Sequence, residues 1–268
     1  MNTSANKRRT LGLLAAASIT GMVMAGTATA EDVVFTDPTG DDNGPGNYVY
    51  PTDAVYKRGS FDLTKFVVSK DGANVDFAVD VNSRLEDPWG MGTGFAVQMV
   101  FIFVKTGPGG HTDTPPGVNA KFAAGNEWNK LVVLSPQRKA RVVSEANAKT
   151  GAMAKDIVVP NITRGSGRTI RGSVPLAELG GDGNIEAWGY QVVMQSNEGF
   201  PAGKDFLTRK VNEYEGQHRW GGGNDGDCDP HIMDVLDGPD AKQSDMLAYE
   251  CGPNGESVKM ATLKMIKK

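Results

Sequence analysis

The sequence predicts an all-β fold, an antiparallel β-sandwich with long acidic and Gly/Pro-rich loops. About eight to ten short segments alternate apolar and polar residues or carry runs of β-forming residues, as strands do. The 268 residues include 34 Gly and 14 Pro, which fits short strands joined by turns better than long helices. We find no convincing helical pattern longer than about ten residues. Many short strands separated by turn signals are typical of a sandwich.

Residues 1–30 have the composition of a secretory signal peptide. Lys7-Arg8-Arg9 forms a basic start, an apolar stretch of small residues follows, and Ala28-Thr29-Ala30 is a cleavage site. The paired arginines also match a twin-arginine signal, so both export routes stay open. The apolar stretch is too short for a membrane span, and we expect none in the mature chain. The protein is therefore expected in the periplasm, on the cell surface or outside the cell, with 31–268 as one domain.

The clearest strand pair lies early in the mature chain. Phe61 and Leu63 share one face of the first strand, and the apolar residues of 74–81 alternate with polar ones. Lys70-Asp71-Gly72 between them is a hairpin turn, so the two strands should pair antiparallel, with one dry and one wet face. Residues 95–104 are apolar apart from one glutamine, which predicts a central strand buried on both faces.

The second half of the chain continues the β pattern. Residues 188–194 alternate along one strand, and residues 175–179 indicate a single helical turn. Further short strands are expected at 130–134, 138–144, 156–159, 168–174 and, as a terminal strand, 258–266.

The most distinctive segment is the loop from Asp37 to Gly46. It holds three carboxylates, three glycines and two prolines, a density of breakers that requires a loop. β-forming residues on both sides favour a loop held between two strands. Asp37, Asp41 and Asp42, together with backbone carbonyls, suit a hard, oxygen-preferring cation such as calcium. The alternative is an acidic surface turn whose side chains bond their own backbone.

A second acidic loop lies near the C-terminus. Asp225, Asp227 and Asp229 are spaced as in the first half of an EF-hand calcium loop. The match then ends, because Pro230 replaces the glycine of the sharp turn and Leu236 replaces the bidentate glutamate. The segment has calcium-compatible spacing without being an EF-hand, and the alternative is a solvated acidic turn pinned by its cysteine.

The two cysteines, Cys228 and Cys251, have one natural pairing in an exported protein, and we predict that disulfide. Closing this loop would stabilise the fold by roughly 3 kcal/mol on the chain-entropy model. No Cys-x-x-Cys-His segment occurs, which excludes covalent c-type haem. The wide spacing of the cysteines also argues against a zinc ribbon.

Six short motifs are distributed over the mature chain. They are the run from Asp37 to Thr52, Gly59-Ser60-Phe61-Asp62-Leu63, Asp87-Pro88-Trp89-Gly90, Gly117-Val118-Asn119, Trp188-Gly189-Tyr190 and the run from Gly226 to Leu236. Together they resemble the glucodextranase C-terminal domain family, which is related to the DOMON-like β-sandwiches. The resemblance runs over nearly all of the mature chain. It implies a β-sandwich that serves as a non-catalytic carbohydrate-binding or cell-surface module, with structural calcium among its expected features.

Sugar rings have apolar faces that lie on aromatic side chains, while polar residues bond their hydroxyls. Five aromatic residues in or beside loops are the candidates for binding a polysaccharide or a cell-surface glycan: Trp89, Trp128, Trp220, Tyr48 and Tyr50. The alternative for each is a core or loop-anchoring role. Nucleic acid is not an expected partner, because the formal charge of −4 becomes about −7 once the cations at 7–9 are removed.

DOMON-like relatives imply a rival function, non-covalent binding of haem b for electron transfer in the periplasm. The axial ligands would be a Met and a Lys or His, and the candidates are Met91, Met99, Met194, Met233, His111, His218 and His231. No spacing singles out one pair. We predict that the chain is not an enzyme, because it has neither Gly-x-Ser-x-Gly nor His-Glu-x-x-His.

Overall fold

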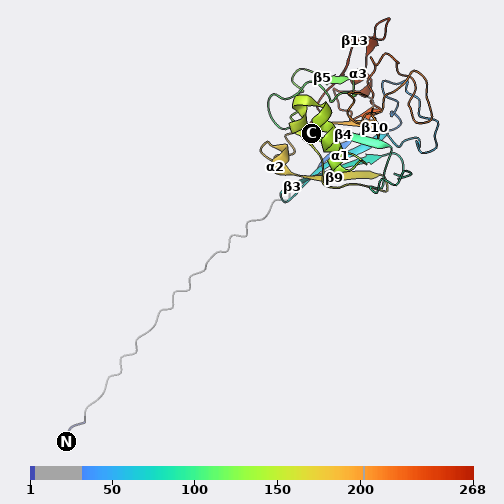
Figure 1. The fold of residues 1–268 in the computed structure, drawn as a ribbon. Helices are drawn as coiled ribbons and strands as arrows, with labels where there is room; N and C mark the ends of the chain where they lie inside the picture. Colours follow the sequence, from blue (N-terminus) through green and yellow to red (C-terminus); the bar gives the residue numbers. More distant parts are fainter. Residues whose placement is uncertain (4–31, 202) are drawn as a thin grey trace.

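Two five-stranded sheets carry the fold in the computed structural model, which describes residues 1–3, 32–201 and 203–268 (Figure 1). The first sheet has the order β1 (Val33–Thr36), β2 (Leu63–Asp71), β3 (Asn74–Val81), β9 (Thr169–Pro175) and β8 (Thr163–Ser166). The second has the order β11 (Asp234–Val235), β10 (Gly189–Ser196), β4 (Gln98–Lys105), β6 (Lys130–Leu134) and β7 (Ile157–Val158). The predicted β-sandwich is confirmed. The predicted signal peptide lies outside the described residues, except for its first three.

β2 and β3 form the hairpin that the sequence predicts. They pair antiparallel, and Asp71 faces Asn74 across the turn. Gly72 in this turn has a positive φ of 57°, a conformation that favours glycine. Every second residue of β3 is buried, so the alternation in the sequence corresponds to a core face and a wetter face.

β4 and β10 form the centre of the second sheet. They pair over eight residues each, from Gln98 opposite Ser196 to Lys105 opposite Gly189. Both strands are buried on both faces along nearly all their length, as predicted for residues 95–104. The ring of Tyr190 in β10 meets that of Phe66 in β2 at 5.7 Å between centroids, which joins the two sheets in one core.

The strand predicted at 138–144 is wrong, because α1 (Lys139–Lys149) occupies that segment. Adjacent valines are typical of a strand. The helix instead buries Val142 and Ala146, which are four residues apart and share one helical face, and leaves Val143 exposed. Ion pairs of Glu145 with Arg141 and Lys149, one turn away on each side, support it.

Smaller elements close the ends of the sandwich. They are β5 (Ala120–Phe122), η1 (Gly151–Asp156), α2 (Leu176–Leu179), α3 (Gln243–Met246), β12 (Glu250–Cys251), β13 (Ser257–Lys259) and β14 (Ala261–Leu263). The predicted helical turn is α2, and the predicted terminal strand appears as the separate strands β13 and β14. The hairpin with β13 projects from the body at the end opposite β9 (Figure 1). Within the described residues, no helix is both long enough and apolar enough to cross a membrane.

The predicted disulfide between Cys228 and Cys251 is confirmed, with the two Cα atoms 5.6 Å apart. Cys251 ends β12, which pairs with β13. The bond therefore ties the second acidic loop to the projecting hairpin.

Candidate functional site

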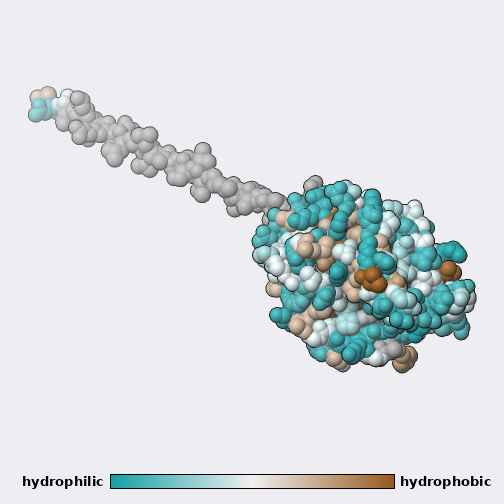
Figure 2. All heavy atoms as spheres, turned by 90° about the horizontal axis from the view of Figure 1, so that it is seen from above, coloured by the Kyte–Doolittle hydropathy of each residue, from teal (hydrophilic) through white to brown (hydrophobic). Residues whose placement is uncertain are grey.

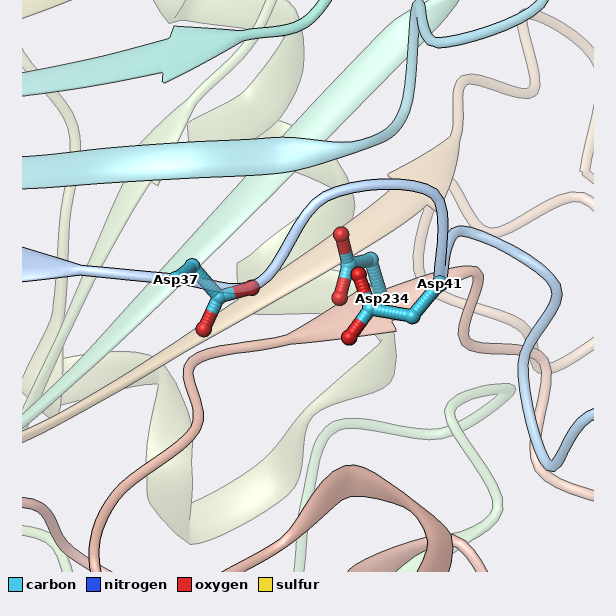
Figure 3. Close-up of side chains that lie close together, drawn as sticks. All are labelled: Asp37, Asp41 and Asp234. Carbon is cyan, nitrogen blue, oxygen red and sulfur yellow. The ribbon is translucent and has the colours of Figure 1, made fainter.

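Three aspartates from two distant parts of the chain meet at the end of β1 (Figure 3). Asp37 follows the last residue of β1, Asp41 lies in the loop beyond it, and Asp234 begins β11. One carboxylate oxygen of each lies within 4.8 Å of the others. We call Asp37, Asp41 and Asp234 the carboxylate cluster.

Hydrogen bonds with backbone groups hold the carboxylate cluster in place. The Asp37 amide donates to the Thr64 carbonyl at 3.1 Å, which continues the β1–β2 ladder by one bond. Asp37 Oδ1 accepts from the Asp237 amide at 2.6 Å, and Asp234 Oδ2 accepts from the Leu63 amide at 2.7 Å. The loop is held by Asp62, whose Oδ2 accepts from the Gly40 amide at 2.8 Å.

Each member of the cluster keeps one buried oxygen without a hydrogen-bond partner in the described part of the chain. These atoms are Asp37 Oδ2, Asp41 Oδ1 and Asp234 Oδ1. Asp62 Oδ1, beside the cluster, is also buried without a hydrogen-bond partner in the described residues. Buried acceptors without donors are costly, and carboxylate oxygens are the ligands that calcium prefers. This set of carboxylate oxygens therefore fits a hard divalent cation.

The electrostatics of the cluster also favour a cation. Burial raises the pKa of Asp37 to about 8, although the hydrogen bond from the Asp237 amide lowers it, and the negative charge of Asp41 raises it further. Burial is likewise the largest cause that raises the pKa values of Asp41 and Asp234. Like charges this close cannot all ionise without compensation.

Asp42, the third carboxylate predicted in the first loop, lies outside the cluster. It accepts a hydrogen bond from the Tyr50 hydroxyl. Burial raises the pKa of Asp42 and that bond lowers it. The structure thus gathers Asp37 and Asp41 with Asp234, which sequence reasoning missed. The Asp-Val-Leu motif of residues 234–236, which carries the family resemblance, was the available signal.

The aspartates of the second acidic loop do not converge on one point in the way the carboxylate cluster does, although Asp227 and Asp229 both contact His231. Asp225 Oδ1 accepts from the Glu213 amide at 2.9 Å. Asp227 forms ion pairs with Lys210 and with His231, and the hydrogen bond from His231 is the largest cause that lowers its pKa to about 2. Asp229 is buried and accepts from the Tyr48 hydroxyl at 3.2 Å. Calcium binding by this loop stays a prediction.

The five candidate aromatic residues differ in exposure. Trp128, Trp220 and Tyr48 are buried in the core, and Tyr50 is half-buried against the ring of Trp220. Trp89 is 40% exposed. Among the five, only Trp89 offers a broad ring surface to a ligand.

Trp89 lies in an open cleft of about 440 Å³, which we call the Trp89 cleft. It is lined by Trp89, Met91, Gln137, Arg141, Asn197, Glu198, Gly199, Phe200, Arg209 and His218. Phe200 is 91% exposed. Sequence reasoning missed Phe200, although a phenylalanine between Gly199 and Pro201 in a breaker-rich loop is a usable sign of an exposed aromatic.

Neighbouring side chains hold the Trp89 ring in place. The rings of Tyr56 and His218 pack edge-on against it at 6.4 and 6.1 Å between centroids, and the Arg209 guanidinium lies 5.9 Å from its centre. Arg209 in turn donates to the Tyr56 hydroxyl and to the His218 carbonyl. The aromatic surface is thus ordered before any ligand arrives.

The residues proposed for haem ligation lie in different surroundings. Met99, Met194 and Met233 are buried, and Met91 lines the Trp89 cleft. His111 bonds Asp156 and His231 lies between Asp227 and Asp229. Haem b binding stays a prediction.

The family described as the C-terminal binding module, SLH-like, of glucodextranase matches residues 33–265. The chain belongs to this family. The matched segment spans both sheets, the carboxylate cluster and the Trp89 cleft of this binding module. The resemblance predicted from the sequence motifs is confirmed. A comparison of the module with curated proteins found no match.

Proposed function

We propose that this binding module is an exported, non-catalytic protein that binds a polysaccharide or a cell-surface glycan in the Trp89 cleft. The observation that carries the proposal is the pairing of two exposed aromatic residues, Trp89 and Phe200, with polar side chains around one hollow. An indole face contacts the apolar face of a sugar ring, and amide and guanidinium groups bond the hydroxyls. Membership in a family of binding modules supports the same function.

The character of the surface is compatible with a polar ligand. On the face shown in Figure 2, hydrophilic residues prevail and hydrophobic residues form small separate groups. The polar lining of the Trp89 cleft includes Gln137 and Asn197, whose side chains bond each other at 3.1 Å. Amide side chains ordered in this way suit the hydroxyls of a sugar.

We also propose that the carboxylate cluster binds a calcium ion with a structural role. Asp37, Asp41 and Asp234 would hold it through the oxygens that lack partners. Because Asp234 belongs to β11 and the others follow β1, the ion would join an edge of each sheet. Its charge would balance carboxylates that otherwise oppose ionisation.

The test is affinity electrophoresis of the purified protein through gels that contain starch, dextran or a cell-wall polysaccharide. We expect at least one glycan to retard the protein, and Trp89→Ala to abolish the retardation. Tyr214→Ala is the matched control, since Tyr214 is 74% exposed and does not line the cleft. Equal retardation of Trp89→Ala and Tyr214→Ala would place the binding site outside the Trp89 cleft. Free passage of the wild-type protein through every gel would refute glycan binding.

A further inference from the structure

The Trp89 cleft carries surplus positive charge in an acidic protein. Two cations line it, Arg141 and Arg209, against one carboxylate, Glu198. Glu198 pairs with Arg209 and Arg219, whereas Arg141 pairs with Glu145, which does not line the cleft. The chain as a whole has a formal charge of −4, so the cleft differs in sign from the average surface.

The carboxylate inside the cleft, Glu198, is already neutralised by the protein. Its Oε2 lies 3.2 Å from Arg209 Nε and 3.1 Å from Arg219 Nη2. Its Oε1 accepts from the Phe200 amide at 3.0 Å. The side chain is 9% exposed. A ligand therefore meets donors rather than this acceptor.

Arg141 is the cation best placed for a ligand. It lines the cleft, and its side chain is 40% exposed. Its Nη2 donates to the Gly199 carbonyl at 2.8 Å and faces Glu145 at 3.3 Å. Within the described residues, Nη1 and Nε make no such contact. A guanidinium held through one nitrogen can present its other N–H groups to a carboxylate.

Two further acidic groups near the cleft have partners of their own. Asp87, two residues before Trp89, accepts from the Met91 and Gly92 amides, each at 2.7 Å. Asp53 Oδ2 lies 4.0 Å from His218 Nε2, and Asp53 does not line the cleft. Its two oxygens accept from the Val55 amide and the Gln217 side chain, each at 3.0 Å. Within the described residues, neither Asp53 nor Asp87 forms an ion pair with Arg141, whose partner is Glu145.

We propose that the Trp89 cleft selects an acidic oligosaccharide, with a sugar ring on Trp89 and the carboxylate of a uronic acid on Arg141. This inference rests on the proposed glycan-binding function and names its ligand class. Ring stacking supplies affinity for acidic and neutral sugars alike. A charge-assisted hydrogen bond to a guanidinium adds affinity only for an acidic sugar, so it distinguishes the two classes. The ligand class is thus set by Arg141, and the contact area by Trp89 and Phe200.

The test compares tetragalacturonate with maltotetraose by isothermal titration calorimetry on the purified protein. We expect tetragalacturonate to bind about tenfold more tightly at low salt, and this preference to shrink as salt screens the charges. Arg141→Gln should lower the affinity for tetragalacturonate about tenfold more than that for maltotetraose, because glutamine can still bond hydroxyls but has no charge for a carboxylate. Arg164→Gln is the matched control, since Arg164 is exposed on β8 and does not line the cleft.

The outcomes separate the two levels of the proposal. Equal affinity for both oligosaccharides, or equal behaviour of the Arg141 and Arg164 variants, overturns the acidic preference and leaves glycan binding in place. A protein that binds neither oligosaccharide and passes freely through every polysaccharide gel refutes both.

Discussion

Asp234 is the residue on which the proposed calcium site depends most. It is fully buried, and burial raises the pKa of its carboxyl group well above the ordinary range. One oxygen accepts from the Leu63 amide, and the other has no partner in the described part of the chain. A buried carboxylate in this state requires either a proton or a cation.

Asp234→Asn should therefore have opposite effects with and without calcium. In excess calcium, wild-type protein should gain several degrees in melting temperature, because an ion that binds only the native state stabilises it by mass action. The variant should gain none. In chelator at pH 8 the variant should be at least as stable as wild type, since it removes a buried charge. Thermal unfolding followed by fluorescence measures both.

Asp42→Asn is the matched control for this experiment. Asp42 belongs to the same loop as Asp41 and is about as buried as Asp37, but its carboxylate bonds Tyr50. It should retain most of the calcium-dependent gain. The opposite pattern, loss in Asp42→Asn and retention in Asp234→Asn, would contradict the assigned ligands.

At the scale of the element, α1 offers a direct contrast between neighbouring valines. Val142 is fully buried and Val143 is 37% exposed. Val142→Ala should cost about 2 kcal/mol in the free energy of unfolding, since it leaves a cavity under the helix. Val143→Ala should change it by less than about 0.5 kcal/mol, because alanine favours a helix. Urea denaturation compares the two, and equal costs would contradict the helical packing.

The strands were more predictable than the helix for a physical reason. The alternation in β3 and the continuous apolar run in β4 each leave one arrangement that buries the apolar side chains. In α1 the two adjacent valines resemble a strand locally. The helical signals in this segment are the spacing of four residues between Val142 and Ala146, and between Glu145 and each of its ion-pair partners.

The candidate sites show the same limit. Asp37 and Asp41 were predictable because the loop composition marks them, but Asp234 joins them only through the β10–β11 pairing. The Trp89 cleft collects residues from five separated segments of the chain. Trp89 is exposed while Trp220 is buried, and residue type does not distinguish the two. Spatial convergence of distant residues is what the sequence alone lacked.

At the scale of the molecule, a small hydrophobic cluster rich in aromatic residues, separate from the main core, lies between the two candidate sites. Its buried members are Tyr48, Tyr56, Phe61, Val97, Val211, Trp220 and Met233. On one side, Tyr50 packs on Trp220 at 4.0 Å between centroids and donates to Asp42. On the other, Tyr56 packs against Trp89. The loop that contributes Asp37 and Asp41 and the floor of the Trp89 cleft thus share one packed support.

Two groups of the fold, Asp37 and His231, bind a proton more tightly than they do in the unfolded chain. Asp37 has a folded pKa of about 8 against an ordinary value of 3.8, and Asp41, Asp62 and Asp237 face it. His231 is the other: burial lowers its pKa, but its hydrogen bonds to Asp227 and Asp229 outweigh this and raise it. In both cases the folded state holds protons more tightly than the unfolded state, so stability falls as pH rises through this range.

Calcium should remove the part of this pH dependence that belongs to the carboxylate cluster. Without calcium, the melting temperature should fall between pH 5 and pH 8, as Asp37 approaches its folded pKa. With saturating calcium the fall should be smaller, because the ion displaces the protons and holds the carboxylates ionised. The difference between the two curves should therefore widen with pH. Parallel curves across this range would show that no cation competes with protons at Asp37, Asp41 and Asp234.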